Sequence, residues 1–257
     1  MTLAVGIDVG STATKIVFMN NKEDIHCHIR PTGWSPREAA QEGIRSLLDE
    51  TGYSESQIKA TVATGYGRIA LQFADRTVTE ITCHGRGAAF LIHGADLVID
   101  IGGQDSKVLK INPQGKVLDF LMNDKCAAGT GRFLQVMAAA LGVDVSELAD
   151  LSANQEPVNI SSMCTVFSET EVIGLLAQGV AKGAIVAGLH QSIARRMAAM
   201  VGRLGEPENK AVFTGGVALN QGVQRSLEQL MGIPVVTHKY SQAAGAIGAA
   251  LIAQKML

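Results

Sequence analysis

The chain has 257 residues, enough for one large domain or two small ones, and its 47% apolar and 18% charged residues are typical of a globular protein. A formal net charge of -2 and 4% aromatic residues provide neither the positive field nor the stacking surfaces that nucleic-acid binding requires. No apolar run reaches the roughly 18 residues of a membrane helix, and four cysteines are too few for a disulfide framework, so we expect a cytoplasmic protein with reduced thiols that binds neither nucleic acid nor membrane.

The first predicted elements form a hairpin. Apolar, β-rich runs at 3–7 and 16–18 flank a glycine turn, and a third strand at 26–30 follows a polar turn. A helix should come next, because Ser35 is a favourable N-cap and Pro36 suits the first helical position. Its expected buried stripe consists of Ala39, Ala40, Ile44, Leu47 and Leu48.

An internal repeat then organises the rest of the chain. Residues 7–15 align without a gap on 99–107, at a constant offset of 92 residues. The second copy repeats the elements of the first, with expected strands at 97–99, 108–111 and 116–121 and an expected helix stripe of Phe133, Leu134, Met137 and Leu141. Each half returns to a strand, at 59–64 or 211–214, the second after a longer helical insertion. The sequence therefore predicts an α/β fold of two duplicated domains, 1–95 and 96–257, with a cleft lined by the two glycine turns. For the last helix, packing on the first domain is left open as an alternative.

Both glycine turns have the composition of phosphate sites. Glycine lets the backbone approach a ligand, and convergent N–H dipoles bind anions. The candidate phosphate residues are Ser11, Thr12, Ala13, Thr14 and Lys15 in the first turn and Gly102, Gly103 and Gln104 in the second. Asp8 and Asp100, at equivalent strand ends, suit the binding of Mg²⁺ through its waters or the orientation of an attacking water. One such turn alone could be a plain hairpin; two at a constant offset favour a functional pair.

Three further glycine-rich segments differ in their expected roles. The segment 214–220 follows a strand and opens a helix, and its Gly215, Gly216 and Val217 could lie against a nucleoside. The segment 242–250 is typical of a small-residue helix built for close packing, which we favour over ligand contact, although Gln242 is kept as an adenosine candidate. The segment 65–70 matches a loose dinucleotide fingerprint without the acidic residue that should follow, so we interpret it as a turn.

Two cysteines have informative surroundings. Cys126 and Cys164 each precede a predicted helix, whose N-terminus favours thiolate, and Glu169 and Glu171 are expected in the first turn after Cys164. A free cysteine is more often a small buried hydrophobe than a ligand. Two thiolates per chain cannot complete a site of four cysteines, but a two-fold dimer could.

Other polar side chains are given structural roles. In the run 26–28, Cys27 should point away from both neighbouring histidines because side chains alternate along a strand, so the run is not a metal site. We expect Cys83 to be a buried thiol, and Arg195 and Arg196 to lie on a solvated helix face.

The set of motifs resembles the actin, Hsp70 and sugar-kinase superfamily of ATPases, whose domains have a ribonuclease H-like fold with the nucleotide cleft between them. Members of that superfamily carry two phosphate motifs, an adenosine motif and a glycine-rich connecting helix in this order. The resemblance sharpens to the ATP-dependent activators (component A, archerases) of 2-hydroxyacyl-CoA dehydratases, in the BadF/BadG/BcrA/BcrD ATPase family. The phrases that carry it are GIDVGSTATK, ATGYGR, VIDIGGQDSK, MNDKCAAGTGRFL, CTVFSETEV and TGGVALNQGV.

The resemblance implies a specific activity. In that family a homodimer holds one [4Fe-4S] cluster through two cysteines of each subunit, which match Cys126 and Cys164. ATP hydrolysis with Mg²⁺ then drives a low-potential electron, received from a donor such as ferredoxin or flavodoxin, into a partner dehydratase or reductase. Two alternatives stay open: a small-molecule kinase of the same fold, with Asp100 as base, and a cluster-free nucleotide-dependent switch that binds a partner protein.

Overall fold

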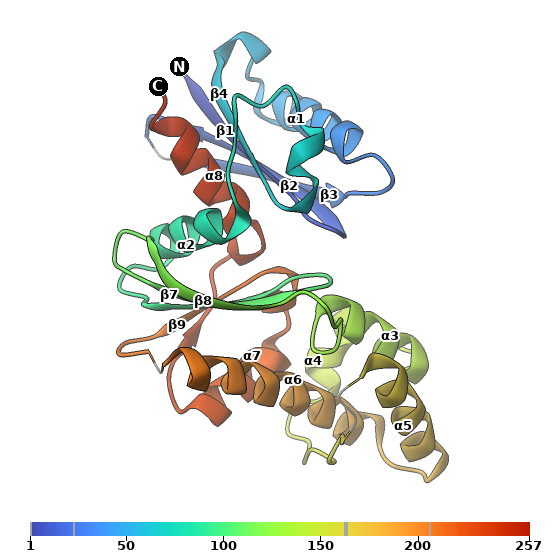
Figure 1. Ribbon diagram of the computed structural model, residues 1–257. Helices are drawn as coiled ribbons and strands as arrows, with labels where there is room; N and C mark the ends of the chain where they lie inside the picture. Colours follow the sequence, from blue (N-terminus) through green and yellow to red (C-terminus); the bar gives the residue numbers. More distant parts are fainter. Residues whose placement is uncertain (1, 23, 162–163, 206) are drawn as a thin grey trace. The chain divides into compact units, whose positions relative to one another are not determined.

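The computed structural model describes residues 2–22, 24–161, 164–205 and 207–257 (Figure 1). Within these residues, contacts divide the chain into two compact units. Unit 1 is formed by residues 1–98, 109–118 and 238–257, and unit 2 by residues 99–108 and 119–237. The unit that contains the start of the chain thus also contains its last segment.

Unit 1 is built on a sheet with the strand order β3-β2-β1-β4-β5. The strands are β1 (Leu3–Val9), β2 (Ala13–Asn20), β3 (Ile25–Pro31), β4 (Ile58–Thr64) and β5 (Arg76–Thr77). β1 runs antiparallel to β2 and parallel to β4, and the whole of β1 is buried. Because side chains alternate along a strand, β1 contributes to two cores, and Leu3, Val5 and Ile7 pack on one face while Ala4 packs on the other.

The helix α1 (Pro36–Thr51) covers the first of these faces, as Figure 1 shows. The Ser35 side chain accepts a hydrogen bond from the Glu38 N–H, and proline occupies the first turn, so the predicted start is confirmed. Ala40 and Leu47 are in the core, and the half-buried side chains of Ile44 and Leu48 pack against it. Short 3-10 turns follow at Glu55–Gln57 and, after β4, at Tyr66–Ala70.

Two helices with small residues cover the other face. They are α2 (Glu80–Leu91) and α8 (Ala244–Gln254), and α8 also packs on β1, β2 and β4 (Figure 1). A Cβ at Gly87 would lie 1.9 Å from the Ala244 carbonyl oxygen, and one at Gly248 would lie 1.8 Å from that of Cys83. The helices therefore approach to backbone contact, which confirms the close packing predicted for the segment 242–250, although the α-helix begins only at Ala244.

Unit 2 contains most of a second sheet, with the order β10-β9-β6-β7-β8. Its strands are β6 (Leu97–Ile101), β7 (Ser106–Ile111), β8 (Val117–Asn123), β9 (Ala211–Thr214) and β10 (Val235–Val236). Written in reverse, this order repeats that of the first sheet strand for strand. The predicted duplicated, actin-like α/β fold is confirmed, although β8 begins and ends later than the predicted strand at 116–121.

The helices of unit 2 include the long insertion that the sequence predicts before β9. They are α3 (Gly131–Leu141), α4 (Leu148–Leu151), α5 (Thr165–Ala177), α6 (Lys182–Leu204) and α7 (Gln221–Met231), with 3-10 turns at Val145–Glu147 and Gly216–Leu219. The predicted stripe of α3 is buried throughout. Among the described helices, none combines the length and the apolar character that crossing a membrane would require.

Candidate functional site

The first glycine turn joins β1 to β2. The Gly10 N–H donates to the Ala13 carbonyl at 3.1 Å and closes the turn, whose tip exposes Ser11 and Thr12. Asp8 and Lys15 are direct cross-strand partners, and the Lys15 Nζ lies 3.0 Å from the Asp8 Oδ2. A buried carboxylate therefore lies beside a half-buried ammonium group directly behind a tip with free hydroxyl groups.

Hydroxyl groups brace this turn from behind. Thr32 donates to the Gly10 carbonyl at 2.8 Å, and the hydroxyls of Thr14 and Thr32 lie 3.0 Å apart. Thr14 is fully buried, so its side chain supports the turn, whereas Ser11 and Thr12 present their hydroxyls at the surface. The candidate phosphate residues 11–15 thus divide into an exposed tip and a buried support.

The second glycine turn joins β6 to β7 in unit 2. The Gly102 N–H donates to the Asp105 carbonyl at 2.9 Å, and Gln104 is exposed at the tip. Behind it, the Thr214 hydroxyl donates to the Asp100 Oδ1 at 2.7 Å. The Lys107 Nζ lies 2.7 Å from the Asp105 Oδ2 and 3.4 Å from the Asp100 Oδ2. Each turn therefore carries an aspartate paired with the lysine seven positions later in the sequence.

Each aspartate turn lies against a glycine that comes at the end of another strand, β4 in unit 1 and β9 in unit 2. Gly65 and Gly215 have φ values of +83° and +86°, and each opens a 3-10 turn. A Cβ would lie 2.4 Å from the Val9 carbonyl oxygen at Gly65 and 2.2 Å from that of Ile101 at Gly215. The segment 65–70 in unit 1 is therefore the counterpart of the segment that begins at Gly215 in unit 2. The shared Thr-Gly after an apolar strand was the sequence signal for this equivalence.

Close approach also explains a glycine beside Asp8. A Cβ at Gly245 would lie 2.9 Å from the His84 Nε2 and 3.1 Å from the Asp8 Oδ2. His84 and Gly245 thus border the first aspartate, a role that the sequence did not reveal. Of the remaining nucleoside candidates, Gly216 is exposed and Val217 is buried in unit 2. Gln242 is half-buried in the 3-10 turn Ser241–Ala243 of unit 1.

The cysteine loops lie in unit 2. Cys164 is the N-cap residue of α5, which confirms the predicted position just before a helix. Its side chain is exposed. Cys126 is half-buried in the loop between β8 and α3, and α3 begins only at Gly131, so Cys126 is not at a helix N-terminus as predicted. The Asn123 side-chain amide instead holds this loop by donating to the Cys126 carbonyl at 2.9 Å.

Two hydrogen bonds join the first turn of α3, which directly follows the Cys126 loop, to the second glycine turn. The Gly131 N–H donates to the Gly102 carbonyl at 2.9 Å, and the Arg132 N–H donates to the Gly103 carbonyl at 2.8 Å. A Cβ at Gly131 would lie 3.2 Å from the Gly102 carbonyl oxygen, so the contact leaves little room for a side chain. The candidate phosphate turn and the segment after Cys126 are therefore one hydrogen-bonded piece.

Two expectations about other side chains are wrong. The first turn of α5 contains no acidic residue; Glu171 lies further along and accepts hydrogen bonds from the N–H and hydroxyl of Ser161, both at 2.9 Å. Arg195 is exposed as predicted, but Arg196 is half-buried, because its side chain lies against Gly129 in the Cys126 loop.

Cys83 is a buried thiol, as predicted, and Cys27 is half-buried. Burial raises the pKa of the Cys83 thiol to about 12, partly offset by a hydrogen bond with Thr64. On β3, Cys27 packs toward the face that α8 covers, and burial raises its pKa to about 11 although the Lys15 charge lowers it. His26 stacks edge-on with Tyr53 instead, which confirms the alternation along the strand. Among the described residues, no group of three or more His, Cys, Asp or Glu side chains is placed to hold a metal ion.

Comparison with known proteins identifies the family. The model of the BadF/BadG/BcrA/BcrD ATPase family matches residues 5–253. The chain belongs to this family. The 2-hydroxyisocaproyl-CoA dehydratase activator of Clostridioides difficile is 45% identical to this chain over 250 residues, which cover 97% of this chain and 94% of that protein. The chain is therefore similar to a dehydratase activator over nearly its whole length.

Solved structures of family members have the same fold. Component A of the Acidaminococcus fermentans (R)-2-hydroxyglutaryl-CoA dehydratase matches with a TM-score of 0.95 and 43% identity, covering 100% of this chain and 99% of that one. The activator of the Clostridium difficile 2-hydroxyisocaproyl-CoA dehydratase, solved with bound ADPNP, matches with a TM-score of 0.93 and 44% identity, covering 100% and 98%. The sequence-based resemblance to this ATPase family is confirmed.

Proposed function

We propose that this member of the BadF/BadG/BcrA/BcrD family is an ATP-hydrolysing activator that passes single electrons to a 2-hydroxyacyl-CoA dehydratase or a related reductase. The support is the end-to-end similarity to two dehydratase activators, one of which was solved with an ATP analogue. ATP and ADP are then its nucleotides, and an electron donor such as ferredoxin or flavodoxin reduces it. The two halves proposed from the sequence, 1–95 and 96–257, each contribute one glycine turn.

The proposed nucleotide residues divide by chemistry. The exposed hydroxyls of Ser11 and Thr12 at the first tip, the Gln104 amide at the second tip and the N–H groups of both turns bind phosphate oxygens. Lys15 adds positive charge. Asp8 and Asp100 orient the attacking water and hold Mg²⁺ through its waters. Gly215, Gly216, Val217 and Gln242 form the proposed adenosine set. Each aspartate has a lysine ammonium group beside it, at 3.0 Å from Asp8 and 3.4 Å from Asp100.

The cysteine set fits a cluster shared by two chains. All four cysteines are free, and Cys164 is exposed while Cys126 is half-buried. Cys83 is buried and Cys27 is half-buried against the core under α8, and burial raises the pKa of both thiols. Since one chain offers two suitable thiols and a [4Fe-4S] cluster needs four ligands, the proposal requires a homodimer with Cys126 and Cys164 of both chains as ligands. The cluster, when bound, supplies the one-electron carrier.

The observation that carries the proposal is the pair of hydrogen bonds between the first turn of α3, which directly follows the Cys126 loop, and the second glycine turn. Gly131 and Arg132, five and six residues after Cys126, donate to Gly102 and Gly103. A change in the turn when the γ-phosphate is lost would therefore reach the cysteine loop directly through the backbone. Such a connection gives ATP hydrolysis a route to the electron carrier, which a kinase of the same fold would not need.

The first test is an anaerobic purification in which iron and sulfide are quantified per chain. We expect about two irons and two sulfides per chain in the wild type, equivalent to one cluster per dimer, and their loss in Cys126→Ala and Cys164→Ala. The matched controls are Cys27→Ala and Cys83→Ala, which remove thiols outside the proposed ligand set and should keep the iron. An iron-free wild type after anaerobic reconstitution would refute the electron-transfer role and favour the kinase or the switch.

A second test addresses hydrolysis. Asp100→Asn keeps the shape of the side chain and should lower the rate of ATP hydrolysis at least about 100-fold, because it removes the charge that orients water and Mg²⁺. The thermal midpoint and ADP binding, measured on the same protein, show whether the site still folds. A folded, ADP-binding Asp100→Asn variant with the wild-type rate of hydrolysis would remove Asp100 from the proposed machinery.

A further inference from the structure

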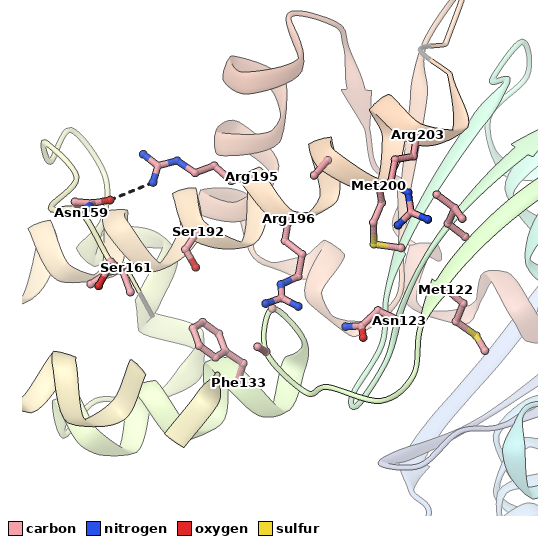
Figure 2. Close-up of a pocket in the computed structure, with 15 residues that line it drawn as sticks. Met122, Asn123, Phe133, Asn159, Ser161, Ser192, Arg195, Arg196, Met200 and Arg203 are labelled. Atoms are coloured by element: carbon pink, nitrogen blue, oxygen red, sulfur yellow. Dashed lines mark hydrogen bonds between the residues drawn. The ribbon is translucent and has the colours of Figure 1, made fainter. Parts of the chain in front are cut away.

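A cavity of about 800 Å³ in unit 2 borders both cysteine loops (Figure 2). One wall contains Asn123, Ala128 and Gly129, which flank Cys126, and another contains residues 159–161, shortly before Cys164. The helix α6 forms the remaining side with Ser192, Arg195, Arg196, Ala199, Met200 and Arg203. The cavity thus lies between segments that flank the two cysteines.

The described lining of this cavity is positively charged. It contains three arginines from α6, and no carboxylate is among the described residues that line it. The arginines differ in direction: Arg195 points to the wall that contains Asn159, and it donates to the Asn159 Oδ1 at 3.2 Å and to the Gln191 Oε1 at 2.7 Å. Figure 2 shows Arg196 extending from α6 toward Phe133 and the loop that follows Asn123.

Arg196 contacts the Cys126 loop directly. A Cβ at Gly129 would lie 3.2 Å from the Arg196 Cδ and 3.6 Å from its Nε, so the arginine stem and the start of the guanidinium lie over the backbone of Gly129. Gly129 has a φ of +82°, which glycine adopts without strain. Arg196 therefore holds the loop over Gly129, in addition to the hydrogen bond from Asn123 to the Cys126 carbonyl. Where the loop ends and α3 begins, Gly131 and Arg132 tie the chain to the second glycine turn.

We propose that Arg196 is a positioning residue for the electron carrier: it holds the Cys126 loop in place and supplies a positive charge that raises the reduction potential. This inference rests on the proposed function. A thiolate-ligated cluster becomes more negative by one charge on reduction, so a nearby guanidinium stabilises the reduced form more than the oxidised form. Arg195 and Arg196 are adjacent in sequence, but only Arg196 lies against the loop, which makes Arg195 a matched control.

The test compares Arg196→Gln, Arg196→Lys and Arg195→Gln in anaerobic redox titrations of the cluster-loaded dimer, followed by electron paramagnetic resonance. At the wild-type midpoint potential, Arg196→Gln should have a ratio of reduced to oxidised cluster about tenfold lower, equivalent to about 59 mV for one electron. Arg196→Lys keeps the charge and should recover most of the shift. Arg195→Gln should titrate like the wild type.

Iron and sulfide content, measured on the same samples, separates this inference from the proposed function. A wild type without iron overturns both. Wild-type iron content and an unchanged midpoint in Arg196→Gln overturn only the role of Arg196. If Arg196→Gln loses its iron while Arg196→Lys retains it, the positioning role is supported; equal iron loss in Arg196→Gln and Arg195→Gln would overturn it.

Discussion

A buried histidine shows how single residues support the site in unit 2. His190 of α6 lies within 3.1 Å of the Ser152 Oγ through Nδ1 and within 3.2 Å of the Asn220 Nδ2 through Nε2. Asn220 caps α7, because its Oδ1 accepts from the N–H groups of Gly222 and Val223. The Asn220 amide donates to Nε2, so the network requires a neutral imidazole. Burial and then the Arg225 charge lower the His190 pKa to about 4.

This low pKa predicts a pH dependence of stability. Between the unfolded pKa of about 6.5 and the folded value of about 4, the unfolded chain binds a proton that the folded chain does not. Stability should therefore fall as the pH drops through this window, and His190 should account for about 2 kcal/mol between pH 7 and pH 5. Urea unfolding at both pH values should show this loss in the wild type and a smaller loss in His190→Gln. Equal losses in both proteins would contradict the assignment.

The lysine behind the second glycine turn provides another residue-scale prediction. Lys107 is 3% exposed and lies between Asp100 and Asp105, so Lys107→Met leaves two largely buried carboxylates without their counter-charge. We expect a loss of about 3 to 5 kcal/mol in the free energy of unfolding. The control is Lys110→Met on the same strand, where the side chain is only half-buried. A similar cost in both variants would show that the ion pairs add nothing specific.

At the scale of elements, glycine determines how closely helices pack. α2 and α8 meet at Gly87 and Gly248, where a Cβ would overlap backbone atoms of the opposite helix. Part of the high glycine content of this chain is therefore required by packing, and another part by the positive φ values of turns such as Gly65 and Gly215.

This packing predicts opposite effects for two glycine substitutions in helices. Gly87→Ala places a methyl group 1.9 Å from the Ala244 carbonyl oxygen and should destabilise the protein by about 3 kcal/mol or more, because the helices must separate. Gly202→Ala in α6 meets no atom within 4 Å and should stabilise by about 0.5 to 1 kcal/mol through helix propensity. Urea unfolding of the two variants checks both signs, and a neutral Gly87→Ala would show that the crossing is loosely packed.

At the scale of the whole molecule, unit 1 needs both ends of the chain. α8 packs on β1, β2, β4 and α2, and nearly all of its residues are buried. A chain ending at Thr237 should therefore lose the fold of unit 1, because the sheet face opposite α1 would lie open to water. Circular dichroism and limited proteolysis should detect this loss. Removal of only the exposed residues 255–257 is the control and should change the stability by less than about 0.5 kcal/mol.

What the sequence by itself determined was local. The hairpins around Gly10 and Gly102, the cap at Ser35 and the repeat at an offset of 92 follow from short patterns of alternation, capping and glycine placement, and these patterns are written in contiguous residues. The same contiguous motifs carry the resemblance to the family, without any knowledge of the fold.

Only the tertiary structure decided which distant residues meet. Arg196 lies over Gly129, Gly131 donates to Gly102, and α8 packs against α2, although each pair is separated by tens of residues or more. Such contacts depend on the angle and position at which whole elements pack against one another. Neither the period of a helix nor the composition of a loop predicts that packing geometry. For this reason the glycine turns were predictable from the sequence, whereas the connection of one of them to a cysteine loop was not.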